Sequence, residues 1–114
     1  MSMQNADGYI KIAATVPLSP GLLVTPTGAL CVASTLKTHI GVSQENAIVG
    51  QLTTLLNPMG KNLKVQASLP INVGDPIYYA AAGQVTNVIG TNLQIGVAID
   101  AATGAGSIIE VAFV

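Results

Sequence analysis

Apolar and polar residues alternate with a period of two in several stretches of this 114-residue chain. The clearest are "NLKVQASL" at residues 62–69, "NLQIGVAID" at 92–100 and "IEVAF" at 109–113. Successive side chains of a strand point to opposite faces, so this alternation is typical of half-buried β-strands. No stretch carries a capped helical stripe, and "SQENAIVGQL" at 43–52 fits at most a short turn. The pattern therefore predicts an all-β protein.

Glycine and proline divide the chain into short segments. "TPTG" at residues 25–28 places both residues where a tight turn needs them, and further breaks fall at 57–62, 70–76 and 101–106. The predicted strands are residues 9–16, 21–25, 28–34, 38–42, 47–56, 62–69, 76–80, 83–89, 92–99 and 106–113. Regular short strands between such turns predict a small barrel or sandwich of antiparallel strands. We expect residues 1–16 to form an N-terminal arm and first strand, and residues 17–114 a single β domain.

The two halves of the chain echo each other. "GLLVTPTGALCV" from Gly21 resembles "GDPIYYAAAGQV" from Gly74, and "HIGVSQENAIVG" from His39 shares Ile-Gly-Val with "QIGVAIDAATG" from Gln94. The offsets are 53 and 55 residues, close to half the chain. A strand-forming composition also produces such matches by chance, so two readings stay open. A true duplication would place two similar β-units in one core.

Charged residues are scarce. Four Lys and five acids make 8% of the chain, whereas about 25% is usual, and 50% of the residues are hydrophobic. Such a composition leaves apolar surface outside the core, which usually marks association surfaces. A net charge of −1 argues against nucleic-acid binding. No apolar stretch reaches the roughly 20 residues of a membrane span, and the start lacks a signal-peptide pattern, so we expect synthesis in the cytoplasm.

Residues that could perform catalysis are few and scattered. His39 is the single histidine and Cys31 the single cysteine, and the five acids occur singly. No pairing suggests a nucleophile with its base, and no spacing suggests metal ligands. We read Cys31 as a small buried residue and His39 as structural. Asp75, between Gly74 and Pro76, is expected to stabilise its turn through hydrogen bonds to the backbone. We therefore expect no catalytic residues, no bound metal, no cofactor and no enzyme activity.

Tyr78 and Tyr79 are adjacent in one predicted strand. Neighbouring side chains of a strand face opposite ways, so we expect one ring in the core and the other at an interface.

The segment at residues 74–114 resembles the C-terminal half of the capsid cement, or head decoration, proteins of tailed bacteriophages. The shared elements are a Gly-Asp pair, an apolar-aromatic strand, a Gly-Gln-Val-Thr turn, an Asn-x-x-Ile-Gly-Val-Ala strand, an Ala/Gly-rich loop and a final Val-rich strand. They correspond here to residues 74–75, 77–79, 83–86, 92–98, 101–106 and 108–114. The first half is more weakly similar, through "PLSPGLLV" and "IGVSQENAIVGQLTTLL". It has Gly21-Leu22 where the family commonly has Gly-Asp.

The resemblance implies a structural virion protein on the exterior of an expanded phage head. Such proteins commonly sit as homotrimers and bridge neighbouring subunits of the major capsid protein against internal pressure. It implies no small-molecule substrate, no nucleic acid and no membrane. We expect the N-terminal arm to be flexible and to add a strand to a capsid edge. Candidate capsid or oligomer contacts are Tyr9, Ile10 and Ile12 in the arm, with Tyr78 or Tyr79 elsewhere.

Two other functions remain open. A carbohydrate- or cell-surface-binding β-module of a phage fibre or bacterial adhesin is the alternative, although sugar sites usually present exposed aromatic rings. The chain is only 4% aromatic and has no Trp, which argues against it. An enzyme subunit is third.

Overall fold

The structure is a computed structural model that describes residues 9–32, 38–57, 62–88 and 93–113. Within these ranges the regular structure consists of β-strands and one short 3-10 helix, η1 (Ala81–Gly83), so the all-β prediction is confirmed. The strands are β1 (Tyr9–Ala13), β2 (Leu23–Val24), β3 (Gly41–Ser43), β4 (Leu52–Leu56), β5 (Asn62–Gln66), β6 (Pro76–Tyr79), β7 (Val85–Thr86), β8 (Gln94–Ala98) and β9 (Ile108–Phe113).

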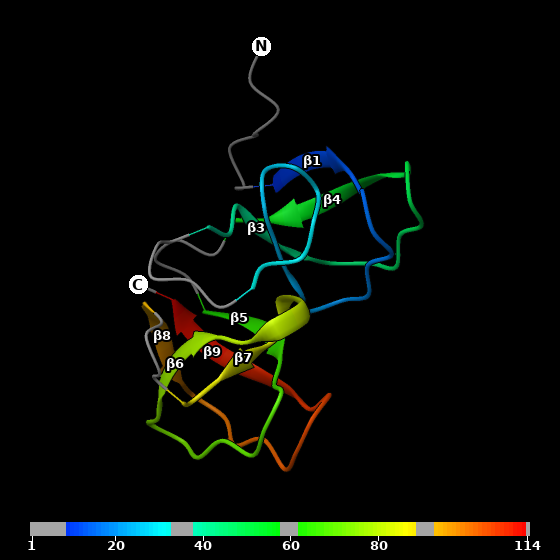
Figure 1. The fold of residues 1–114 in the computed structure, drawn as a ribbon. Coiled ribbons are helices and arrows are strands. Elements are labelled where there is room, and N and C mark those ends of the chain that lie inside the picture. The colour runs from blue at the N-terminus through cyan, green and yellow to red at the C-terminus, as the bar shows by residue number, and fades with distance from the viewer. Residues whose placement is uncertain (1–8, 33–37, 58–61, 89–92, 114) are drawn as a thin grey trace.

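The strands form two antiparallel sheets, one from each half of the chain (Figure 1). The first sheet has the order β1-β4-β3-β2 and the second the order β5-β9-β8-β6-β7. We call residues 9–57 the first unit and residues 62–113 the second unit. When β7 is left aside, both sheets have the same order, which is the first strand of the unit, then its last, its third and its second. The second unit adds β7 to this plan, where the first unit has only an isolated bridge between Val24 and Leu30.

The two units also share strand register. In the first unit Leu23 lies opposite Val42, which lies opposite Leu56; in the second, Pro76 lies opposite Val97, which lies opposite Ala112. Counterparts are 53 residues apart for β1 and β2, 55 for β3 and 56 for β4. Because one slipped residue would turn every side chain to the other face, an equal register puts equivalent residues on equivalent faces.

The turns repeat as well. Gly21 and Gly74 have φ of 88° and 89°, values that favour glycine because a side chain would be strained there. The amide N of Gly21 donates to Ser43, and that of Gly74 to Ala98, each at 2.9 Å. The similarity seen in the sequence between residues 21 and 74 is therefore structural, and of the two readings that the sequence left open the structure favours two similar β-units.

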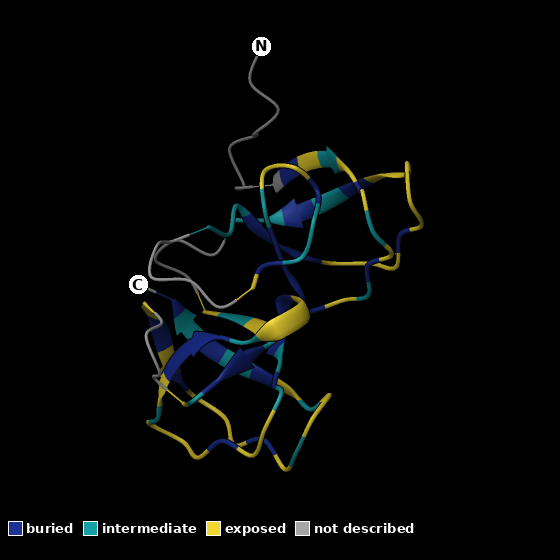
Figure 2. Cartoon of the chain, in the orientation of Figure 1, coloured by how far each residue is buried: buried dark blue, intermediate teal, exposed yellow. Residues whose placement is uncertain are grey.

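The hydrophobic core is unequally divided between the units (Figure 2). The first unit has a small cluster of its own, formed by Ile10, Ala14, Leu18, Val24, Ala47 and Leu55. The larger cluster is built mainly from the second unit, and the first unit contributes Leu23, Cys31 and Val42 to it. The two units consequently share one continuous packed boundary, which we call the seam.

Several predicted strands are shorter in the structure. Residues 28–32 form only the single bridge at Leu30, so the strand expected at 28–34 is not found in its described part; residues 33–34 lie outside the described residues. The strand expected from residue 47 begins at Leu52, because residues 48–51 form a turn. β1 pairs along its length with β4 and is part of the first sheet. The division into residues 1–16 and 17–114 stays a prediction, and residues 1–8 of the arm lie outside the described residues.

Candidate functional site

The seam is held by backbone hydrogen bonds as well as by apolar packing. The amide N of Gln66 on β5 donates to the carbonyl of Gly21 at 2.8 Å, and that of Gly83 donates to the carbonyl of Cys31 at 2.8 Å. The Gln66 side chain donates to Ser19 and to the carbonyl of Pro20, both at 2.9 Å. Bonds of this kind define both distance and orientation, so they fix the register between the units.

Tyr79 connects the units through its hydroxyl. The oxygen accepts hydrogen bonds from the backbone N of Thr38 at 2.9 Å and of His39 at 3.1 Å, and it also bonds Nδ1 of His39. The imidazole lies between the rings of Tyr79 and Phe113, with centroids 5.6 and 5.9 Å away. Through these contacts Tyr79 and His39 stabilise the packing of the two units at the seam.

Both adjacent tyrosines are buried, which corrects one expectation. Tyr79 is 0% exposed and Tyr78 is 5% exposed, so neither ring is available at the surface of the single chain. Tyr79 belongs to the large core cluster, and Tyr78 lies opposite Thr86 on β7. The expectation that one ring is available for an interface is not met in the single chain, because alternation along a strand says nothing of what covers its second face; a contact role for Tyr78 or Tyr79 stays a prediction.

Cys31 also lies at the seam. Burial raises the pKa of its thiol. The thiol therefore stays protonated and is a poor nucleophile. Among the described residues no group of three or more His, Cys, Asp or Glu side chains lies close enough to hold a metal ion.

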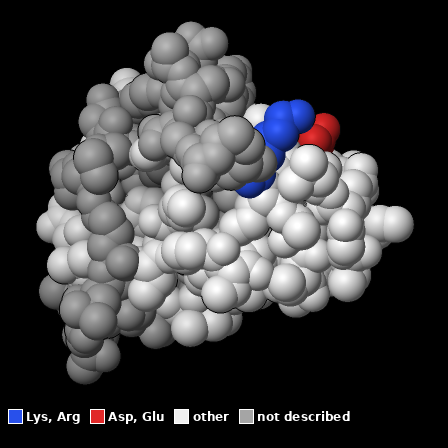
Figure 3. All heavy atoms as spheres, turned by 90° about the horizontal axis from the view of Figure 1, so that it is seen from above, with Lys and Arg blue, Asp and Glu red and all other residues white. Residues whose placement is uncertain are grey.

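The surface carries little charge. On the face shown in Figure 3 the described atoms are nearly all uncharged, and the few basic and acidic ones gather in one place. No helix within the described ranges is long and apolar enough to cross a membrane.

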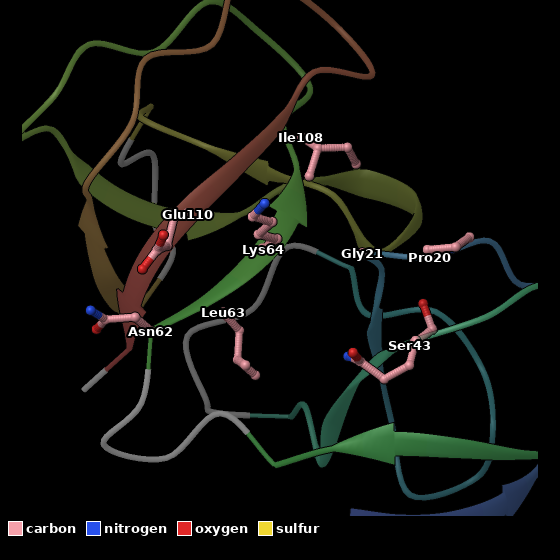
Figure 4. Close-up of a pocket in the computed structure, with 9 residues that line it drawn as sticks. Pro20, Gly21, Ser43, Asn62, Leu63, Lys64, Ile108 and Glu110 are labelled. Atoms are coloured by element: carbon pink, nitrogen blue, oxygen red, sulfur yellow. The ribbon is translucent and has the colours of Figure 1, made fainter.

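A groove of about 410 Å³ opens along the seam (Figure 4). Pro20, Gly21, Ser43 and Gln44 of the first unit line it, facing Asn62, Leu63, Lys64, Ile108 and Glu110 of the second. Lys64 and Glu110 are directly opposite each other on β5 and β9. This pairing of opposite charges suits the stabilisation of a sheet face. Among the described residues that line the groove there is no histidine or cysteine, and the two ionisable ones, Lys64 and Glu110, offer no nucleophile with a matched base.

Asp75 closes the turn that leads into β6. Its carboxylate accepts hydrogen bonds from the backbone N of Asn72 at 2.9 Å and from the side chain of Asn87 at 2.8 Å, so the predicted role in the turn is confirmed. The bond from Asn87, with a smaller effect from Asn72, lowers the pKa of this carboxyl group. Hydrogen bonds to the charged form favour ionisation, and burial opposes it only weakly here.

Two of the three most exposed apolar side chains, Ile48 and Val49, lie in the turn before β4, and a further exposed one, Leu52, begins the strand. Ile48 is 72% exposed, Val49 61% and Leu52 56%. We call these three residues the apolar loop. The backbone N of Ile48 donates to the Gln51 side chain at 3.1 Å, and the N of Gln51 donates back to the carbonyl of Ile48 at 3.0 Å. The loop is thus ordered by its own hydrogen bonds while presenting aliphatic groups to solvent.

The contact residues predicted from the sequence are placed differently. Ile10 is 8% exposed and belongs to the small core of the first unit, and Ile12 packs against that core while remaining half-buried. The side chain of Tyr9 lies outside the described part of the chain. A contact role for these residues stays a prediction. Sequence reasoning missed the apolar loop, although "AIVG" in the middle of a turn was a usable signal, since turns favour Gly, Pro, Asn, Asp and Ser.

Comparisons with known proteins agree with this architecture. Among solved structures, the crystal structure of the head fiber gp8.5 N base in bacteriophage phi29 is similar, with a TM-score of 0.74 and 18% identity over 93% of this chain and 92% of that one. An identity this low supports a shared fold alone. Among curated proteins, none matches this sequence. A sequence profile of phage cement proteins matches residues 5–113, which is nearly the whole chain and includes both units. With that match added to the two-sheet fold, this chain belongs to the phage cement protein family.

Proposed function

We propose that this protein binds the outer surface of an expanded phage head, where it bridges neighbouring subunits of the major capsid protein and stabilises the shell. Membership in the phage cement family supports a structural role at the capsid of the virion. The finer statements, which are binding to the major capsid protein, an outer position and action as a homotrimer, are our proposal.

The observation that carries the proposal is the apolar loop. Folding leaves Ile48, Val49 and Leu52 in solvent although their own turn is well ordered. Exposed apolar groups of this kind mark interaction sites when they lie together. A loop that is already ordered loses little conformational freedom on binding, which favours attachment. We assign the capsid-docking surface to this loop.

Low charge suits the same role. Many copies held close together on one shell repel each other less when each is nearly neutral, because like charges interact within a Debye length of about 8–10 Å. Repeated modest contacts on a lattice also add up to durable attachment.

The test is to mix the purified protein with undecorated expanded heads and to measure co-sedimentation and the temperature at which the heads lose their DNA. We expect binding and a higher release temperature. Val49→Lys should weaken binding strongly, because it places a charge in the docking surface. Ala105→Lys is the matched control, since Ala105 is the exposed counterpart of Val49 in the equivalent turn of the second unit.

Absence of binding, or binding without added heat resistance, would remove the cement function. Equal loss of binding in both variants would remove the apolar loop as the docking surface. Binding of the isolated protein to a glycan array would instead favour the carbohydrate-binding alternative. Among the aromatic side chains that the structure describes, Tyr78, Tyr79 and Phe113 are all buried, so none of these three offers a ring for a sugar to stack on.

A further inference from the structure

The two units differ most at one pair of equivalent faces. In the first unit Leu23 and Val42 lie side by side on the outward face of the sheet, and both are 0% exposed because the second unit covers them at the seam. Their counterparts in the second unit are Pro76 and Val97. Pro76 is exposed and Val97 is 37% exposed, although the register is the same.

The glycines beside these rows show the same contrast. A side chain on Gly21 would meet Gln66 and Ile108 of the second unit at 3.3 Å, whereas one on Gly74 would meet nothing within 4 Å. Around Gly74 the surface is apolar, with Val73 66% exposed and Ile99 38% exposed. The second unit thus presents an apolar face that is covered in the first unit. We call Val73, Pro76, Val97 and Ile99 the open row.

The first unit also has a face that corresponds to the second unit's side of the seam, and this face is only partly buried. In the second unit Val65 and Ile95 are 0% exposed in the cluster that receives Leu23 and Val42. Their counterparts in the first unit are Ile12 and Ile40. Both pack against the small core of the first unit and remain partly exposed. Among the described residues, each chain therefore has one exposed face and one half-buried face that correspond to the two sides of the seam.

We propose that a second copy of this chain covers the open row with the open side of its first unit, so that the contact between copies repeats the seam within the chain. This inference rests on the self-association proposed above and specifies its surfaces. The two faces are different, so the contact is head-to-tail: each copy uses its second unit toward one neighbour and its first unit toward the other. Such contacts close into a ring when the rotation allows it.

Sedimentation velocity of the purified protein over a range of concentrations tests the proposal. We expect the wild type to associate. Val97→Lys in the open row, and separately Ile12→Asp on the opposite face, should each weaken association by about 100-fold or more, because an unpaired charge is buried at the contact. Ala105→Lys is the control and should associate like the wild type, because Ala105 is exposed in the turn before β9 and belongs to neither set of contact residues.

Mixing the two variants identifies the head-to-tail arrangement. The Ile12→Asp chain keeps an intact open row and the Val97→Lys chain keeps an intact first unit, so one contact survives between them. We expect each variant alone to be monomeric and the mixture to form a heterodimer that grows no further. Circular dichroism checks that each variant is folded, and Ile40→Asp replaces Ile12→Asp if that chain unfolds.

A wild type that stays monomeric at its highest soluble concentration would overturn the proposal, as would variants that associate normally. Failure of two folded variants to form a heterodimer would overturn it too, since like faces would then be in contact. Co-sedimentation with heads distinguishes failure of the proposed contact between copies from failure of the proposed capsid binding. A protein that stays monomeric but still binds heads would refute the proposed contact at the open row. It would leave the proposed capsid binding standing.

Discussion

The first and second units have the same strand order and register but depend on the seam to different degrees. Among its described residues, the first unit has six buried apolar side chains in a core of its own and places three others in the core of its neighbour. The second unit has a large core, and its outward face does not take part in it. One β plan thus supports two roles: the first unit is stabilised largely by docking, and the second is the platform on which it docks.

The turns before β2 and β6 show a second difference. In the first unit the buried hydroxyl of Ser43 bonds the carbonyl of Ser19 and accepts from the backbone N of Leu22. In the second unit the position of Ser43 is taken by Ala98, and the carboxylate of Asp75 stabilises the turn from the inside of the loop. Equivalent backbone geometry is therefore reached through a neutral hydroxyl in one unit and a titratable group in the other.

The largest effect is expected from Gly28→Ala. Gly28 has φ of 83°, and a β-carbon there would lie 2.2 Å from the carbonyl oxygen of Ala13, so the backbone of the first unit would have to move. We expect a loss of about 4 kcal/mol or more in the free energy of unfolding. Gly50→Ala is the control, because Gly50 has a similar φ of 86° and open space around it. It should lose only the ~1–2 kcal/mol of the left-handed conformation. Urea denaturation measures both, and equal losses would contradict the steric explanation.

Val42→Ala and Val97→Ala form the cleanest comparison, since the same residue occupies equivalent positions. Val42 is fully buried at the seam, and its truncation should destabilise the chain by ~1.5–3 kcal/mol through lost burial and a cavity. Val97 is 37% exposed, and its truncation should cost ~0.5 kcal/mol or less in a monomeric sample. Thermal unfolding at low protein concentration measures the loss of stability in both variants. Similar losses at both positions would mean that the units are not distinguished by the covering of their outward faces.

Tyr79→Phe removes the hydroxyl that joins the units while keeping the ring. The backbone N–H groups of Thr38 and His39 would lose their acceptor, which should reduce the free energy of unfolding by ~1–2 kcal/mol. Tyr78→Phe, one residue earlier in the same strand, is the control for loss of a phenol. Chemical denaturation of both variants measures the difference, and an unchanged Tyr79→Phe chain would remove this contact from the stability of the seam.

The smallest effect concerns acid. The pKa of Asp75 is lowered from its ordinary value of 3.8, so its contribution to the turn is complete above that value and is lost as pH falls through the lower folded pKa. Ser43 does not titrate in this range. Hydrogen exchange, corrected for intrinsic rates, should therefore show the amide of Gly74 losing protection below about pH 4 while that of Gly21 keeps it. Asp75→Asn should abolish the pH dependence at Gly74, and parallel loss at both glycines would contradict the assignment.

The sequence predicted the features that depend on the local residue pattern. It did not predict the features that depend on contacts across the seam. Alternation gave β5 and β9 nearly correctly, and the match of Gly21 with Gly74 anticipated the second unit. The hydrogen bonds of Tyr79 could not be predicted, because its partners Thr38 and His39 are about 40 positions away, across the seam. The strand expected at 47–56 included the apolar loop, because Ile48 and Val49 have high strand propensity. In the structure the hydrogen bonds of Gln51 form a turn there instead.

The buried position of Cys31 at the seam provides a chemical probe of motion there. It is the single cysteine of the chain, it is 1% exposed at the boundary between the two halves, and its thiol is held in the protonated form. A maleimide reagent can reach that sulfur only when the packing around it opens, so the rate of alkylation measures opening at this boundary without any engineered label. On an assembled shell, the same reaction would report how far the lattice suppresses this breathing.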